Sequence, residues 1–247
     1  MTTIDLNADL GEGDAFDREL LDVVSSCNIA CGAHAGDAAS MSATLQAAIS
    51  KGVAIGAHPS YPDRAGRGRR SYFLAGADLQ KSLVNQIDAL QSIATGAAAT
   101  VSHVKPHGAL YTDAACDRSL AKLVLAVVQQ CAPNAALIGP PNSALELAAN
   151  EAGIRFVAEA FVDRAYLSTG ELVPRSEPNA VHTDFNTITA QAVSLATRHT
   201  VTAQDGAVIA VRADTLCIHG DTPNAAEAAC AVRDVLQANG VTIRAAV

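Results

Sequence analysis

Ile4-Asp5-Leu6-Asn7-Ala8-Asp9 is a short, strand-like run that ends in a carboxylate, and the same pattern recurs along the chain. Seven such runs occur, and all but one end in, or just before, a side chain able to carry out acid–base, metal or anion chemistry. Helix-length, Ala-rich segments separate them. This alternation is typical of parallel βα units, whose loops gather at the carboxyl edge of the sheet. The runs are Ile4–Asp9, Cys27–Cys31 before His34, Val53–His58, Val101–Lys105, Ala136–Gly139, Arg155–Glu159 and Thr215–His219.

The length and composition fit one α/β domain covering residues 1–247. A chain of 247 residues is long enough for a barrel-sized domain with a full core. The hydrophobic fraction of 49% and charged fraction of 17% exclude a disordered chain, and neither a Ser/Gly linker nor a charge block divides it. We expect a helix from Asp14 to about Ser25 and two long irregular loops, at 58–71 and 161–184.

Charge and hydropathy exclude two classes of partner. The net charge of −8 argues against nucleic acid. The sequence lacks an apolar stretch of membrane-spanning length, and its start lacks the basic and apolar segments of a signal peptide. We therefore expect a soluble, cytoplasmic protein that acts on a small molecule.

The strand ends predict one polar pocket, and its most distinctive stretch is Lys105-Pro106-His107. Pro106 restricts the backbone of Lys105 to extended conformations and so fixes the direction of its side chain. Partial burial would lower the pKa of Lys105 and make it a base, or leave it as a fixed cation for an oxyanion or phosphate. The alternative is a lysine that only pairs with a strand-end carboxylate, such as Asp9 or Glu159. His107 is a candidate proton donor or ligand, or it holds the loop backbone. The predicted pocket contains Asp9, His34, His58, Lys105, His107, Glu159 and His219.

Carboxylates and histidines in this set suggest acid–base or metal chemistry. Asn7 lies on the same side of its strand as Asp9, because side chains alternate with a period of two. Asp9, His34 and His58 could form a two-histidine, one-carboxylate metal site. Their spacing is not a local metal motif, and a neutral histidine acting as acid or base needs fewer coincidences.

Four arginines are candidate anion ligands, because a guanidinium binds carboxylate or phosphate with two hydrogen bonds. The alternatives are a solvated loop for the first two, an internal salt link with Asp163 for the third and plain exposure for the fourth. They are Arg64 and Arg70 in the first long loop, Arg164 after the sixth run, and Arg175 in the second long loop.

Five segments resemble the LamB/YcsF family: NIACGAHAGD, GAHPSYPDRAGRGRR, HVKPHGALY, EAFVDRAY and CIHGDTP. The resemblance runs from Ile4 to about Gly240. It implies a (β/α)7-type barrel resembling the glycoside hydrolase/deacetylase barrels. It also implies ATP-dependent 5-oxoprolinase activity, which opens 5-oxo-L-proline to L-glutamate, in a complex with two other subunits.

The implied chemistry leads to a hypothesis for the residues and leaves two alternatives open. Asp9 or Glu159 would activate water, Lys105 and the arginines would stabilise negative charge, and His58, His107 or His219 would protonate the leaving nitrogen. One alternative is a metal-dependent amidohydrolase or deacetylase that acts without ATP. The other is a non-catalytic protein that only binds the substrate for the complex.

Overall fold

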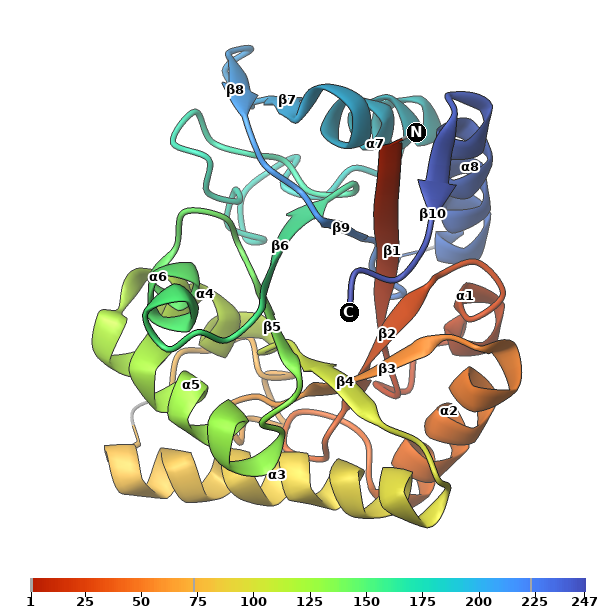
Figure 1. The fold of residues 1–247 in the computed structure, drawn as a ribbon. Coiled ribbons are helices and arrows are strands. Elements are labelled where there is room, and N and C mark those ends of the chain that lie inside the picture. The colour runs from red at the N-terminus through yellow and green to blue at the C-terminus, as the bar shows by residue number, and fades with distance from the viewer. Residues whose placement is uncertain (1, 73, 223) are drawn as a thin grey trace.

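Seven parallel strands form a closed barrel in the computed structural model, which describes residues 2–72, 74–222 and 224–247 (Figure 1). Each strand pairs with the next in chain order, and β9 pairs with both β6 and β1, which closes the sheet. The predicted (β/α)7-type barrel is therefore confirmed. Its strands are β1 (Thr2–Leu10), β2 (Ser26–Ala30), β3 (Ala54–His58), β4 (Val101–Val104), β5 (Ala136–Gly139), β6 (Phe156–Phe161) and β9 (Thr215–Cys217).

Helices surround the barrel and bury their apolar faces against it (Figure 1). α2 begins after Asp37, whose carboxylate accepts a hydrogen bond from the Ser40 N–H, and ends at Gly52 in the left-handed conformation. The helices are α1 (Asp17–Leu20), α2 (Ala38–Lys51), α3 (Gly76–Gly96), α4 (Gly108–Cys116), α5 (Arg118–Cys131), α6 (Ala144–Glu151), α7 (Phe185–Arg198) and α8 (Ala225–Ala238). None of the helices in these ranges is long and apolar enough to cross a membrane.

One local prediction was wrong, and one helix was not predicted. The helix expected from Asp14 to Ser25 is only the single turn α1, because polar groups of this segment are tied to loops instead. Asp14 pairs with Arg67, and the Asp17 carboxylate accepts a hydrogen bond from the Gly11 N–H. α4 was not predicted, and it begins directly after His107.

Three short strands complete the fold. β7 (Thr200–Thr202) and β8 (Val208–Ala210) form an antiparallel hairpin, and β10 (Val241–Ile243) pairs with the start of β1. The chain then turns into the barrel, where Ala246 and Val247 pack against Ala136, Ile138 and Val157 (Figure 1, label C).

The rest of the barrel interior is polar. Asp5 and Asn7 on β1 are fully buried, as are the inward-facing Asn28 on β2 and His103 on β4. Asn28 donates to Asn7 and Asp9 and lies 2.9 Å from the His103 ring nitrogen. Gly56 makes room for that ring, since a Cβ there would lie 2.1 Å from His103 Nε2. His103 is therefore a hydrogen-bonded core histidine.

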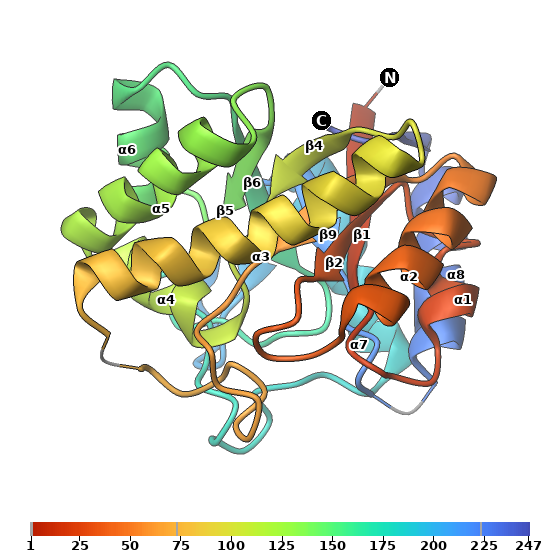
Figure 2. The same cartoon turned by 90° about the horizontal axis from the view of Figure 1, so that it is seen from below.

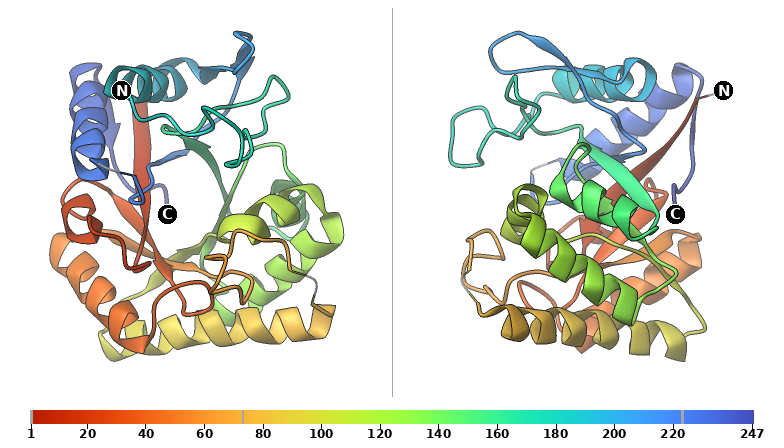
Figure 3. Two further views of the ribbon diagram at one scale, coloured as in Figure 1. Left: turned by 180° about the vertical axis from the view of Figure 1, so that it is seen from behind. Right: turned by 60° about the vertical axis from the view of Figure 1, so that its left-hand side comes forward.

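The long loops lie together at the carboxyl ends of the strands. Figure 2 shows the orange segment between β3 and α3 and the cyan segment after β6 at one end of the barrel, while both termini lie at the other. Figure 3 shows the same loops crossing the mouth of the barrel. Parallel topology thus gathers the strand-end residues into one region.

Candidate active site at the carboxyl ends of the strands

Lys105, which follows β4, is the centre of a buried ionic network. Its Nζ lies 2.9 Å from Asp9 Oδ1 and 2.8 Å from Glu159 Oε1, and its side chain is only 2% exposed. Cys217 Sγ lies 3.3 Å from the same nitrogen. Asn7 donates to Glu159 Oε1, so β1, β4, β6 and β9 all contribute to the network.

The partners of Lys105 and Asp9 favour the charged form of each. Burial by itself would lower the pKa of Lys105, but Asp9, Cys217 and Glu159 raise it well above its usual range. Burial would raise the pKa of Asp9, but His58 and Lys105 hold it well below its usual range. Lys105 thus makes the ion pairs with Asp9 and Glu159 that the sequence left as the alternative, and its partners favour the charged form.

A second group of side chains lies beside Asp9. His58 Nε2 is 3.2 Å from Asp9 Oδ2 and 2.9 Å from His107 Nδ1, and Glu12 Oε1 is 3.2 Å from both His107 Nδ1 and His34 Nε2. Burial lowers the pKa of His34 to about 4 and also lowers that of His107, which favours neutral rings. Asp9, Glu12, His58 and His107 place ligand atoms within 4.8 Å of one another and form a candidate metal site.

The loop after β3 covers this group. The backbone carbonyl of Arg67 lies 2.9 Å from His107 Nε2. Gly68 packs against the side chains of His107 and His34. A Cβ on Gly68 would lie 2.7 Å from His107 Cδ2 and 2.9 Å from His34 Cβ, and its φ of +67° favours glycine. The loop therefore fixes the stacked rings of His34 and His107, whose centroids are 3.8 Å apart.

His219 and Asp163 form a pair at the open side of the site. His219 Nδ1 lies 2.9 Å from Asp163 Oδ2, its ring stacks on Phe161, and its side chain is 14% exposed. Asp163 accepts at Nδ1, so Nε2 is the ring nitrogen left for chemistry. His219, Asp9 and Cys217 have polar atoms within 4.8 Å of one another.

Two arginines meet one carboxylate next to His219. Asp221 Oδ2 lies 2.5 Å from Arg69 and 3.0 Å from Arg175, although the two loops are far apart in sequence. Asp221 Oδ1 is buried without a hydrogen-bond partner among the described residues. Two guanidinium groups on one carboxylate leave a net positive charge at the mouth of an acidic protein.

Three of the predicted anion ligands lie outside this cluster and are engaged elsewhere. Arg64 donates to the backbone carbonyls of Gly32 and Gly36. Arg70 pairs with Asp63 and has a side chain that is 66% exposed. Arg164 is buried and donates to the carbonyls of Ala180 and Val173, where it holds the second long loop together. In this structure these three guanidinium groups contact parts of the protein away from Asp221.

The structure brings together the predicted residues Asn7, Asp9, His34, His58, Lys105, His107, Glu159, Arg175 and His219. Sequence reasoning left Glu12, Asn28, Arg69 and Asp221 out of the predicted pocket. The Gly11-Glu12-Gly13 context pointed to Glu12, and His219-Gly220-Asp221 to Asp221. Asn28 gave no signal, because it reads as an ordinary strand residue.

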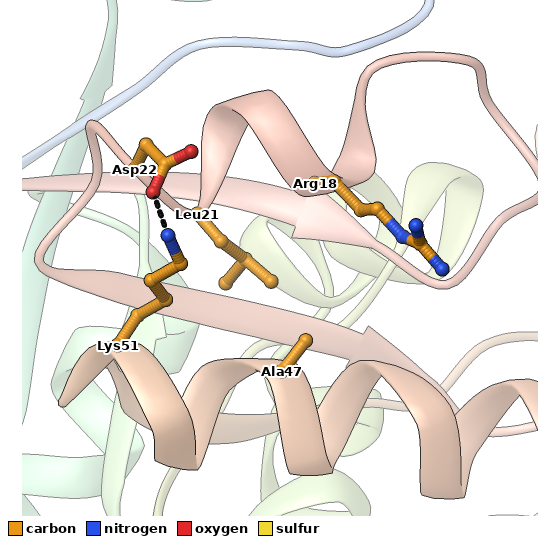
Figure 4. Close-up of a pocket in the computed structure, with 5 residues that line it drawn as sticks. All are labelled: Arg18, Leu21, Asp22, Ala47 and Lys51. Carbon is orange, nitrogen blue, oxygen red and sulfur yellow. Dashed lines mark hydrogen bonds and ion pairs between the residues drawn. The ribbon is translucent and has the colours of Figure 1, made fainter.

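A hollow between α1 and α2 is not part of this site. Asp22 and Lys51 form an ion pair across it (Figure 4). Both residues precede strands in the chain, so the hollow lies toward the amino ends of β2 and β3, away from His58. It is lined by Arg18, Leu21, Asp22, Ala47 and Lys51.

Comparison with known proteins gives relatives over the full length. The LamB/YcsF family profile matches residues 4–247. The chain is 47% identical to a 5-oxoprolinase subunit of Paracidovorax citrulli, with 98% of each chain covered. It is 46% identical to the corresponding 5-oxoprolinase subunit of Nocardia farcinica, again with 98% of each chain covered.

Comparison with solved structures also gives a match over the full length. The lactam utilization protein from Thermus thermophilus superposes with a TM-score of 0.91 at 42% identity, covering 98% of this chain and 99% of that one. A family 4 carbohydrate esterase from Streptomyces lividans has a TM-score of 0.54 at 12% identity, covering 98% and 91%, and shares the fold alone.

Proposed function

The chain belongs to the LamB/YcsF family, and on that premise we propose that it is one component of an ATP-dependent 5-oxoprolinase. The observation that carries the proposal is the full-length match to relatives that are named as 5-oxoprolinase subunits. The complex would hydrolyse the lactam 5-oxo-L-proline to L-glutamate, with ATP as co-substrate. Two further subunits would complete it, and it would work in the cytoplasm, where ATP is available.

The strand-end site has the groups that lactam opening requires. Water must add to the carbonyl carbon, the carbon–nitrogen bond must break, and the ring nitrogen must gain a proton. A five-membered lactam is a stable amide, so phosphorylation of its oxygen by ATP gives a better electrophile. Asp9 is ionised and 12% exposed, and it would orient the attacking water above the fixed charge of Lys105.

His219 is the group best placed to protonate the leaving nitrogen. Asp163 holds its Nδ1, which orients the ring and leaves Nε2 available, and a ring nitrogen of His219 lies within 4.8 Å of polar atoms of Asp9 and Cys217. His58 and His107 direct their inner nitrogens at each other and at carboxylates instead. Of the three histidines considered from the sequence, we therefore assign proton transfer to His219.

Arg69 and Arg175 would bind the substrate carboxylate. They carry the excess positive charge at the mouth, next to His219, and share Asp221 as their partner. Replacing Arg69 with Gln should raise KM for 5-oxoproline by about tenfold with a smaller effect on kcat. An unchanged KM would remove this assignment.

The central test is reconstitution. The purified chain, alone and with its partner subunits, is given 5-oxoproline and ATP, and glutamate, ADP and phosphate are measured. We expect glutamate and ADP in equal amounts from the complex only, and their loss in an Asp9→Asn complex. Full activity of that variant complex would instead indicate that the chain binds substrate without taking part in catalysis.

One observation favours a second candidate, a metal-dependent amidohydrolase that needs no ATP. Asp9, Glu12, His58 and His107 converge as a possible ligand set. Lactam hydrolysis by the isolated chain with added Zn²⁺ or Mn²⁺, and without ATP, would support this candidate over the first.

A further inference from the structure

The outer nitrogens of His58 and His107 are both directed at backbone carbonyls. His58 Nδ1 lies 2.8 Å from the carbonyl oxygen of Lys105, and His107 Nε2 lies 2.9 Å from that of Arg67. A carbonyl oxygen only accepts, so each of these nitrogens carries the hydrogen. A neutral imidazole has one N–H, and the inner nitrogens, His58 Nε2 and His107 Nδ1, therefore present lone pairs.

These lone pairs face each other and two carboxylates. The inner nitrogens are 2.9 Å apart, Asp9 Oδ2 is 3.2 Å from His58 Nε2, and Glu12 Oε1 is 3.2 Å from His107 Nδ1. Four electron-pair donors in contact repel one another unless a cation lies among them. The cation is either one shared proton, which makes an imidazolium, or a metal ion.

From this geometry we propose that Asp9, Glu12, His58 and His107 bind one divalent first-row transition metal ion. An outer N–H held by a carbonyl is the arrangement that orients metal-binding histidines. Three of the separations are 2.9–3.2 Å and a fourth, from His58 Nε2 to Glu12 Oε1, is 3.8 Å, on either side of the roughly 3.3 Å edge of a tetrahedron with bonds of about 2.0–2.1 Å. Two nitrogens and two carboxylate oxygens suit Zn²⁺, Mn²⁺ or Co²⁺.

The local charge also favours a doubly charged ion over one proton. Four carboxylates lie in and beside the group, those of Asp9, Glu12, Asp14 and Glu159. Within the part of the chain that the structure describes, only Lys105 and Arg67 are permanent cations paired with them. Two negative charges remain, which a divalent ion balances and a single imidazolium does not.

His34 has a different part in the site. Its Nδ1 lies 2.8 Å from Ser60 Oγ and its Nε2 lies 3.2 Å from Glu12 Oε1, so it is a positioning residue that packs beside Glu12. The ligand set thus differs from the Asp9, His34 and His58 set considered from the sequence, with Glu12 and His107 in place of His34.

Cobalt titration of the isolated full chain tests the site. The chain is treated with a chelator, dialysed and titrated with Co²⁺, followed by visible absorption and calorimetry. We expect one Co²⁺ per chain, d–d bands of a four- or five-coordinate ion, displacement by Zn²⁺ and a higher melting temperature with metal. The Glu12→Gln and His107→Asn variants should bind at least about 100-fold more weakly, and His34→Asn about tenfold more weakly.

A matched control separates ligands from other histidines. His199 is exposed, has a φ of +53° that Asn tolerates, and lies outside the site, so His199→Asn should bind Co²⁺ like the parent. Melting of each metal-free variant shows whether it folds, and Glu12→Gln keeps the shape of the side chain.

Absence of stoichiometric binding up to about 1 mM Co²⁺ would overturn the proposal. Equal affinity in the folded Glu12→Gln and parent chains would also overturn it, and would leave the shared proton as the cation. These measurements use no ATP, substrate or partner, so they succeed or fail independently of the proposed 5-oxoprolinase activity.

Discussion

Two aspartates on β1 lie inside the same barrel and have opposite environments. Asp5, toward the amino end, is fully buried and accepts hydrogen bonds from the hydroxyls of Ser25, Ser26 and Thr215. Asp9, toward the carboxyl end, contacts Lys105 and His58 and is partly exposed. Burial raises the pKa of Asp5, whereas charged partners lower that of Asp9. The neutral hydroxyl donors around Asp5 are typical of a buried structural carboxylate, whereas the charged partners of Asp9, next to solvent, are typical of a functional site.

The largest effect should come from removing Lys105, the cation that pairs with Asp9 and Glu159. Lys105→Met leaves Asp9 and Glu159 as buried, uncompensated charges, so we expect a loss of about 3–5 kcal/mol in the free energy of unfolding. Turnover of the reconstituted complex should fall below detection. Denaturant unfolding and glutamate release measure the two effects, and turnover within tenfold of the parent would contradict this role of Lys105.

The next largest effect concerns the pair beside Asp9. His219→Asn should lower kcat by about 10²–10⁴-fold with the fold retained, because it removes the proposed proton donor. Asp163→Asn keeps the proton donor but not its orientation. The fall in kcat of this variant should therefore be smaller than that of His219→Asn, and the pH dependence of its kcat should be shifted. Equal and pH-independent losses in both variants would indicate a structural role.

A loop glycine should matter more for activity than for stability. Gly68→Ala places a methyl group against His107 and His34, and we expect about a 100-fold fall in turnover from their displacement. Gly206→Ala is the matched control, since Gly206 also has a positive φ, +88°, but a Cβ there meets nothing within 4 Å. Similar turnover in the two variants would show that backbone strain alone matters.

The two aspartates should give opposite pH dependence of stability. The lowered pKa of Asp9 contributes stability that is present above its unfolded value, near 3.8, and is lost as pH falls. The raised pKa of Asp5 acts in the other direction and lowers stability as pH rises above 3.8. Between pH 5 and 3, Asp9→Asn should flatten the acid loss of stability and Asp5→Asn should steepen it, as measured by urea unfolding.

The smallest effect is expected at Arg70, which lies outside the surroundings of both Asp5 and Asp9. Arg70→Gln removes an exposed guanidinium that pairs with Asp63, so turnover and KM should stay within about twofold of the parent. A tenfold rise in KM would restore the role of anion ligand that the sequence suggested for Arg70. Steady-state kinetics of the complex decide between the two.

The sequence predicted parallel βα units and most of the strand-end residues because both follow from local order, whereas the closed barrel was implied by the family resemblance. A run that ends in Asp9, Lys105 or Glu159 must, in a parallel barrel, present that residue at the same edge. Partners within the cluster were not predictable in this way. Arg69 meets Asp221 across 152 positions, and Arg70, its neighbour in the chain, points to Asp63 instead.

By itself, the order of strand-like and helix-like segments determined the parallel βα units and their strand-end residues, since side-chain period and strand-end chemistry are properties of neighbouring residues. Only the tertiary structure decided that Asp5 has neutral hydroxyl partners and Asp9 has charged ones. It also decided which histidine nitrogen carries its hydrogen and which arginines reach the mouth of the barrel. Those outcomes depend on distances of a few ångströms between segments far apart in the chain, and electrostatic energies in a buried site change steeply over such distances.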